Sequence, residues 1–405
     1  MLKVRFAVST SVAEGQHAPV RQSARMGLAL SSLLAVFLLA GSAPQASAQA
    51  SSGSVTLTQQ ISAIAGNGGT SPAPTASPTT ATGVGIVPEA VVVDSAGNQY
   101  IADSKINAVE MITPAGNISI IAGGGTTQPS SKAMAATSAI LSLPAAATSL
   151  ALDAAGNLYV ADSTMGTHTT EIDEITAPAS GNAQIVALFG NGSKYPSPTA
   201  EPLSSAELLA GVISGMAFDS TGNLYLANFN QGKVYKVTGL GSSNAQISVI
   251  GGYSCNTNNG PFPYPAQVQA NQACMRPYGL ATDNAGNLYV SDQYGANPNN
   301  SGTVDLISGA SGANPQITVI AGWNCYGGPY PYPEQANQAC ISPSGIATDA
   351  RGDIYIDDQN LDTVDVITGG SGGNAQIAAI AGGNSTALHR PRRRSLRRMP
   401  ILSIS

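Results

Sequence analysis

A pattern of ten residues recurs five times in this sequence and constrains its fold more than any other feature. The pattern is Asp-x-x-Gly-Asn-x-Tyr-x-x-Asp, and its copies begin at Asp94, Asp153, Asp219, Asp283 and Asp349. Successive copies begin 59 to 66 residues apart, and only Asn228 and Asp353 depart from the pattern. Such spacing is typical of a propeller or a solenoid, in which each repeat supplies one structural unit.

Each repeat predicts four antiparallel strands. An apolar stretch such as Ala90–Val93 precedes the turn, in which Asp accepts hydrogen bonds from the backbone two residues on and Gly adopts a positive φ. The Tyr that follows begins a second strand, and third and fourth strands are predicted at Ala108–Ile112 and Ile118–Gly123. We therefore expect an all-β fold, a β-propeller of four-stranded antiparallel blades. Five blades are complete, and Gln59–Gly66 matches the fourth strand of a sixth.

One repeat carries a family resemblance. Pro343–Asp358 resembles the NHL repeat, and the Ile-x-x-Ile-Ala-Gly endings resemble those of secreted bacterial NHL-repeat proteins. The resemblance covers Ile61 to Asn384 and implies a β-propeller with four-stranded blades. It implies no single function, because propellers include enzymes, binding proteins and scaffolds.

The regions outside the repeats predict an exported protein. Arg21 and Arg25 precede an apolar run, Leu28–Leu39, and Ala46–Ala48 has the small residues of a cleavage site. We predict a signal peptide at 1–48, an N-terminal strand with a Pro/Thr/Ser-rich linker at 49–86, the propeller at 87–384 and an Arg-rich tail at 385–405. The true start is Met1 or Met26, and the mature protein is expected to be secreted or periplasmic.

The charge distribution bears on partners. Between Gln49 and Asn384 there are seven basic and 22 acidic residues, a balance of about −15. Such a field repels nucleic acid and anionic lipid, so we expect no nucleic-acid partner and no stable membrane insertion after signal cleavage. The expected partner is a protein or a glycan of the cell envelope or its surroundings.

Two loops before the fourth and fifth blades are near-duplicates, and each holds one pair of cysteines. In an exported chain this spacing predicts the disulfides Cys255–Cys274 and Cys325–Cys340. A zinc site is the rival interpretation, but neither pair has a Cys-x-x-Cys motif or a neighbouring His.

The same loops hold a set of aromatic residues that are candidates for ligand binding: Tyr264, Trp323, Tyr326, Tyr330 and Tyr332. Pro-aromatic-Pro runs favour a stiff, extended backbone that suits stacking on sugar rings or docking of a peptide. The alternative is that these side chains cover the edges of the fourth and fifth blades.

No catalytic constellation is evident. His168 is the one histidine between the leader and the tail, and no nucleophile elbow or phosphate-binding glycine loop is present. An acidic cluster in the fifth blade (Asp353, Asp357, Asp358, Asp362, Asp365) lacks the pattern of a calcium loop. We therefore expect a non-enzymatic binding or scaffold module without cofactor or metal. The alternative is a calcium-dependent lactonase-like hydrolase with acidic residues in the propeller channel.

The tail suggests a frameshift. Residues 391–398 read one base later can encode Pro-Ala-Gly-Val-Ala-Phe-Asp-Ala, which matches Pro343–Ala350 with Pro and Asp in register. We therefore hypothesise that a sixth blade was lost after the fifth, and that the Arg-rich tail is aberrant. Resequencing tests this: no Gly-Asn-x-Tyr-x-x-Asp in the +1 frame would contradict it.

Overall fold

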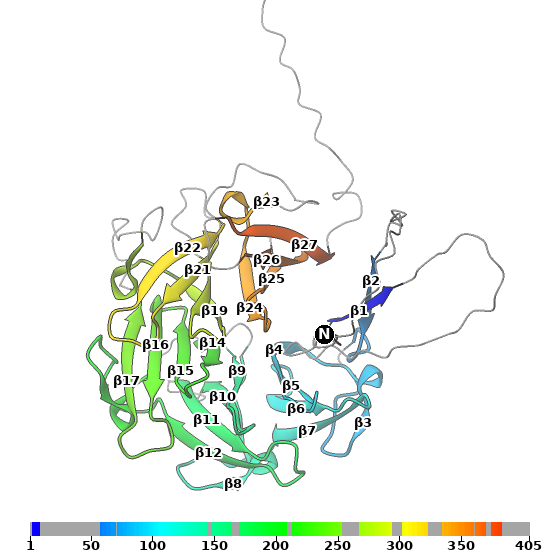
Figure 1. Ribbon diagram of the computed structural model, residues 1–405. Coiled ribbons are helices and arrows are strands. Elements are labelled where there is room, and N and C mark those ends of the chain that lie inside the picture. Colours follow the sequence, from blue (N-terminus) through cyan, green and yellow to red (C-terminus); the bar gives the residue numbers. More distant parts are fainter. Residues whose placement is uncertain are drawn as a thin grey trace, which may run out of the picture.

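The structure is a computed structural model, and it describes residues 2–8, 57–69, 71–144, 148–163, 170–208, 213–252, 267–293, 302–322, 334–359, 361–369 and 374–382. Within these residues the strands form five antiparallel sheets of five strands each and one sheet of two strands. Figure 1 shows the five larger sheets arranged around a common axis as the blades of a propeller. The predicted all-β propeller with five complete blades is therefore confirmed.

The five blades follow the five repeats in order. Blade one contains β3 (Thr79–Thr80), β4 (Pro88–Val93), β5 (Gln99–Asp103), β6 (Ala108–Ile112) and β7 (Asn117–Gly123). Blade two contains β8 (Met134–Ala135), β9 (Leu150–Leu152), β10 (Leu158–Ser163), β11 (Thr170–Thr176) and β12 (Gln184–Phe189). Blade three contains β13 (Glu201–Pro202), β14 (Ile213–Phe218), β15 (Leu224–Asn228), β16 (Lys233–Thr238) and β17 (Gln246–Gly251). Blade four contains β18 (Val268–Gln269), β19 (Pro277–Thr282), β20 (Leu288–Asp292), β21 (Thr303–Ser308) and β22 (Gln316–Ala321). Blade five contains β23 (Glu334–Gln335), β24 (Pro343–Thr348), β25 (Ile354–Asp358), β26 (Thr363–Thr368) and β27 (Gln376–Gly382).

The blades have one strand more than the sequence predicted. In each, a two-residue strand pairs with the start of the fourth strand, as Met134 and Ala135 pair with Ile185 and Gln184. A 3-10 turn follows it, one of η1 (Ala81–Gly83), η2 (Ala136–Ser138), η3 (Leu203–Ser205), η4 (Ala270–Gln272) and η5 (Ala336–Gln338). The four predicted strands are present in every blade, and the fifth was not predicted because two residues are too few to show the alternation by which strands are recognised.

The conserved turn of the repeat is built around its Asp side chain. In blade three, Oδ1 of Asp219 accepts hydrogen bonds from the backbone N–H groups of Thr221 and Asn223. Oδ2 accepts from the side chain of Asn223 and from the hydroxyl of Tyr225. Gly222 has a φ of +83°, which favours glycine. The predicted turn is therefore confirmed, and the Asp has a structural role.

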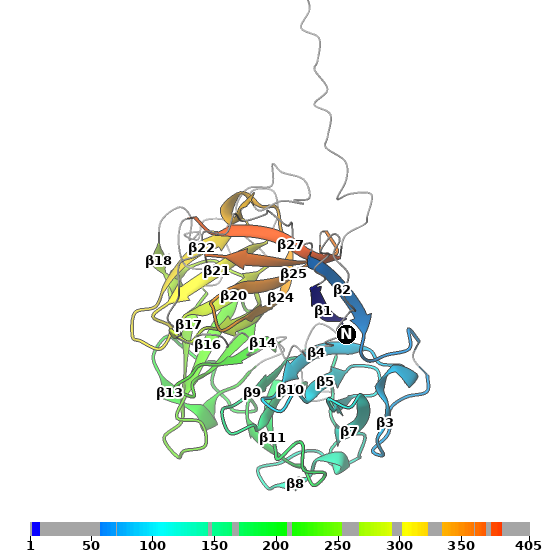
Figure 2. The same ribbon diagram turned by 45° about the vertical axis from the view of Figure 1, so that its right-hand side comes forward.

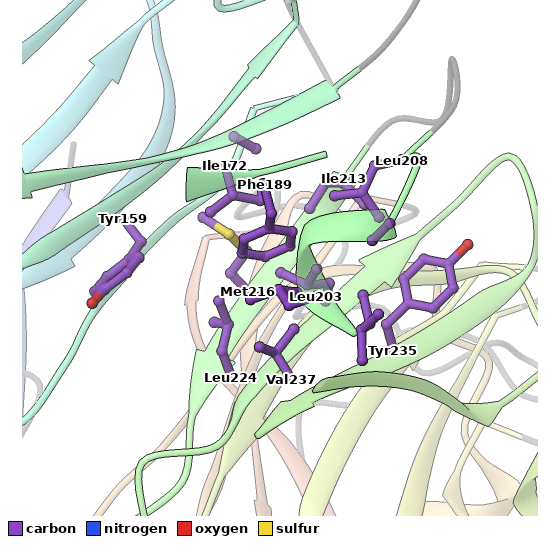
Figure 3. Close-up of a cluster of buried hydrophobic side chains, with 14 of the residues drawn as sticks. Tyr159, Ile172, Phe189, Leu203, Leu208, Ile213, Met216, Leu224, Tyr235 and Val237 are labelled. Carbon is purple, nitrogen blue, oxygen red and sulfur yellow. The ribbon is translucent and has the colours of Figure 1, made fainter. Parts of the chain in front are cut away.

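The core consists of side chains packed between neighbouring blades. Figure 3 shows the layer between blades two and three, where Phe189 and Met216 lie against Leu203. Tyr159 of blade two packs on the ring of Phe218 in blade three, with 4.9 Å between ring centroids. Each large apolar side chain buried in such a layer contributes about 2 kcal/mol to folding. Adjacent blades are thus held together by apolar packing of the kind found in the core of a single domain.

The first full strand of each blade lies innermost. In order around the axis these strands are β4, β9, β14, β19 and β24, each in contact with the next. The approach is close enough that a Cβ on Gly215 in β14 would lie 2.5 Å from the carbonyl oxygen of Tyr278 in β19. The side chains at the start of these strands are thereby brought around one end of the axis.

A two-stranded sheet lies between blade five and blade one. It pairs β1 (Leu2–Val8) with β2 (Leu57–Ala63), and Figure 2 shows it between β27 and β4. The strand predicted at 59–66 is therefore present, although it begins and ends earlier. Its partner comes from residues that the sequence assigned to the signal peptide, whose apolar run Leu28–Leu39 lies outside the described residues. Within the described part of the chain, no helix has the length and apolar character to cross a membrane.

Candidate functional site

One position of the repeat places a polar side chain at the start of every inner strand. It lies five residues before the Asp of the turn and is occupied by Glu89, Thr148, Ser214, Tyr278 and Ser344. The inner strands surround the axis (Figure 1), and because the position is the same in every repeat, the five residues belong to the same end of their strands. We call this end the axial face. The two largest of these side chains are Glu89 and Tyr278, and both are half-buried.

At the axial face, the charges of two side chains act on a third that comes from another blade. Tyr278 of blade four is under the influence of Glu89 in blade one and Asp357 in blade five. Burial, and after it the negative charges of Glu89 and Asp357, raise the pKa of Tyr278. The phenol therefore keeps its proton and remains a hydrogen-bond donor beside two acceptors. Glu89, Tyr278 and Asp357 are called the axial cluster below.

Asp357 departs from the repeat at this face. The matching residues of the other blades are Ala102, Ala161, Ala227 and Ser291, which are all buried. As a whole residue Asp357 is exposed, but its carboxyl group is partly buried. Its Oδ2 accepts a hydrogen bond of 2.5 Å from Oγ of Ser344. Burial of the carboxyl raises the pKa of Asp357, although the hydrogen bond from Ser344 opposes the shift.

Glu89 and Tyr278 each make contacts with further residues at the axial face. Oγ of Ser104 donates a hydrogen bond of 2.7 Å to Oε1 of Glu89. On the other side, Phe229 meets the ring of Tyr278 edge-on at 5.9 Å, and the guanidinium of Arg276 lies 5.2 Å from the Phe229 ring centre. The axial cluster is thus flanked by an aromatic ring and a cation.

The aromatic candidates predicted from the sequence cannot be placed against this site. Tyr264, Trp323, Tyr326, Tyr330 and Tyr332 all lie outside the described residues, and their role stays a prediction. Cys274 and Cys340 are disulfide-bonded. Their predicted partners Cys255 and Cys325 also lie outside the described residues, so the pairing stays a prediction.

The predicted acidic cluster of blade five is dispersed. Asp353 pairs with Arg351 at 2.9 Å in the turn, whereas Asp357 lies at the axial face. Asp358 and Asp365 are buried within the sheet, and Asp362 is exposed. Among the described residues no group of three or more His, Cys, Asp or Glu side chains is placed to hold a metal ion.

Sequence reasoning missed Glu89 and Tyr278. The signal was available in the alignment of the five repeats, since the same position carries small hydroxyl residues in Thr148, Ser214 and Ser344. Glu89 and Tyr278 differ from these residues in size and chemistry.

Comparisons with known proteins add evidence on the fold. No protein-family model matches the chain, and no curated protein matches it in sequence. Solved structures match at low identity. Virginiamycin B lyase from Staphylococcus aureus is 14% identical with a TM-score of 0.41, over 75% of this chain and 73% of that one. A gluconolactonase from Xanthomonas campestris is 14% identical with a TM-score of 0.42, over 74% and 77%. An auxiliary nutrient binding protein from Bacteroides thetaiotaomicron is 9% identical with a TM-score of 0.45, over 74% and 58%.

These comparisons correct one prediction and leave another open. The expectation of a non-enzymatic module is not upheld, because the solved propellers that the chain is similar to include a lyase and a gluconolactonase beside a nutrient-binding protein. At these identities the likeness concerns the fold and assigns no substrate. The likeness to NHL-repeat proteins in particular stays a prediction.

Proposed function

We propose that the axial cluster binds a small polyhydroxylated molecule, a sugar or a sugar-derived lactone. The observation that carries the proposal is that Tyr278 of blade four lies within reach of the charges of Glu89 in blade one and Asp357 in blade five. Two carboxylates accept hydrogen bonds from neighbouring hydroxyls of a sugar, and the protonated phenol donates one. A small-molecule site typically has a small number of polar groups beside an aromatic ring, and here that ring is Phe229.

Lactone hydrolysis is the second candidate, and Asp357 favours it. Burial raises the pKa of Asp357 above that of an ordinary Asp, which makes this carboxyl a better proton acceptor in general base catalysis. In this reaction Asp357 takes a proton from water, the hydroxide adds to the lactone carbonyl carbon, and the ring C–O bond breaks. The proton then passes to the leaving oxygen. Among the described residues no three His, Cys, Asp or Glu side chains are grouped so that they could hold a calcium ion.

We also propose that the chain acts outside the cytoplasm. The apolar run behind Arg25 supports export, and so does disulfide bonding of Cys274 and Cys340, since cytoplasmic thiols are kept reduced. A glycan of the cell envelope would then be the source of the ligand.

Calorimetry with a panel of monosaccharides, sugar acids and lactones tests the proposal. Tyr278→Phe and Asp357→Asn are expected to weaken binding about tenfold each, the loss of one hydrogen bond to a bound ligand. Tyr195→Phe is the control, because Tyr195 is 52% exposed. Lactone turnover, followed by acid release with and without added Ca²⁺, is expected to be lost in Asp357→Asn. Failure of the whole panel to bind, or equal binding by all variants, would overturn the proposal.

A further inference from the structure

Each blade buries two polar side chains at equivalent places, one at the end of its second strand and one on its third strand. In four blades both are carboxyls: Asp103 with Glu110, Asp162 with Asp173, Asp292 with Asp305, and Asp358 with Asp365. Blade three has Asn228 and Tyr235 instead. The strand register explains the pairing: Glu110 lies opposite Ile101, two residues from Asp103, so both carboxyls are on one face of the sheet.

The first carboxyl of each pair has hydrogen-bond donors. Oδ2 of Asp103 accepts from the N–H of Val87, and Oδ1 accepts from that of Lys105. Oδ1 of Asp292 likewise accepts a hydrogen bond of 2.8 Å from the N–H of Arg276. These bonds tie the end of the second strand to the segment that enters the inner strand. In blade two, burial outweighs the hydrogen bond from Ser142 and raises the pKa of Asp162 to about 7.

The second carboxyl has a different environment. Glu110 and Asp173 are both 0% exposed, and none of their carboxyl oxygens has a hydrogen-bond partner among the described residues. An ionised carboxylate in such a place would cost several kcal/mol, so the group keeps its proton.

The charged groups that act on these second carboxyls are acidic. Asp103 acts on Glu110, and Asp292 acts on Asp305. Asp162 and Glu171 both act on Asp173. Within the described residues, no basic side chain acts on any of the three. Burial, and after it the neighbouring carboxylate, raises the pKa of Glu110 to about 8 and those of Asp173 and Asp305 well above their usual range.

We propose that the buried carboxyls Glu110, Asp173 and Asp305 make the propeller a proton-dependent fold, in which each of them retains a proton while folded and the blades lose stability as the medium turns from acid to alkaline. The direction follows from linkage: a group that binds its proton more tightly in the folded chain stabilises the fold at low pH. For Glu110 the contribution is complete below its ordinary pKa of 4.5 and is lost as the pH rises through about 8. Blade three, with Asn228 and Tyr235, lacks this dependence.

Urea denaturation of the full chain at a series of pH values from 5 to 9 tests the proposal. The wild-type midpoint is expected to fall as the pH rises. Glu110→Gln and Asp173→Asn keep the shape of the protonated group and are expected to flatten this fall. Glu201→Gln, at the outer edge of blade three, is the control and is expected to leave it unchanged. A wild-type midpoint that is constant or rises with pH would overturn the proposal.

Infrared spectroscopy provides a readout that does not depend on whether the variants fold. The folded wild-type protein is expected to show the C=O band of protonated carboxyl groups at pH 7, and unfolding in urea is expected to remove it. Absence of this band from the folded protein would show that the pairs are fully ionised, which would overturn the proposal.

Discussion

The hydroxyl of Tyr225 donates a hydrogen bond of 2.9 Å to Oδ2 of Asp219, six residues earlier in the chain. The same pair of positions is bonded in all five blades: Tyr100 with Asp94, Tyr159 with Asp153, Tyr289 with Asp283 and Tyr355 with Asp349 are the others. The bond spans the hairpin from its turn to its second strand. The residues that the repeats share therefore have a structural role in closing the hairpin of each blade. Residues that differ between the repeats are the candidates for a functional role.

Loss of the Asp carboxyl should destabilise the blade. Asp219→Ala removes the acceptor for Thr221, Asn223 and Tyr225, and we expect a loss of about 3 kcal/mol in the free energy of unfolding. Tyr225→Phe removes one of these bonds and should cost about 1 kcal/mol. Chemical denaturation measures both; equal effects would show that the turn network is not the source of the loss.

The same carboxyl predicts a loss of stability in strong acid. Burial alone would raise the pKa of Asp219, but the hydrogen bonds from Asn223 and Thr221 outweigh it and hold the pKa below 3.8. Its contribution is therefore present above that pH and is lost as the pH falls below it. Denaturation of wild type and Asp219→Asn between pH 2 and pH 5 measures this. The variant should lose less stability than the wild type over that range.

A buried lysine connects blades three and four. Nζ of Lys236 donates hydrogen bonds to the carbonyl oxygens of Ala310, Ser311 and Gly312. Lys236→Met leaves three carbonyls without this donor, and we expect a loss of about 2 kcal/mol. Lys233→Met, at the first residue of β16, is the matched control. If both substitutions cost the same in thermal denaturation, the bridge does not hold the blades together.

Close approach of the inner strands should make Gly215 intolerant of a side chain. A Cβ there would meet the carbonyl oxygen of Tyr278, so Gly215→Ala must push β14 and β19 apart at a cost of about 3 kcal/mol. At Gly83 a Cβ would meet nothing within 4 Å, and Gly83→Ala should be nearly neutral. The difference in their thermal denaturation midpoints checks this prediction. A neutral Gly215→Ala would contradict it.

The axial cluster predicts an altered phenol titration. Since the charge of Asp357 helps to raise the pKa of Tyr278, Asp357→Asn should lower that pKa. The phenolate absorbance of each protein, minus that of its Tyr278→Phe counterpart, isolates this one group. An identical alkaline titration with and without the Asp357 carboxylate would show that the two side chains do not face each other.

The repeat made the blade predictable. The spacing of its copies, the Asp and Gly of the turn and the alternation of strands such as Ala108–Ile112 are local properties, and local sequence determines them. The outer strands such as β8 could not be found this way. A strand of two residues has no pattern of its own and forms because the start of the neighbouring fourth strand offers unpaired backbone groups.

In the candidate site, too, some features follow from local sequence and others only from the tertiary structure. The sequence by itself determined that a turn, a Tyr and a strand recur, because these depend on residues within one hairpin. Only the tertiary structure decided that Glu89 and Asp357 act on Tyr278, because these residues come from blades one, five and four and are far apart in the sequence. It likewise decided that Glu110 must keep a proton, since burial depends on what packs against a side chain and not on its neighbours in sequence.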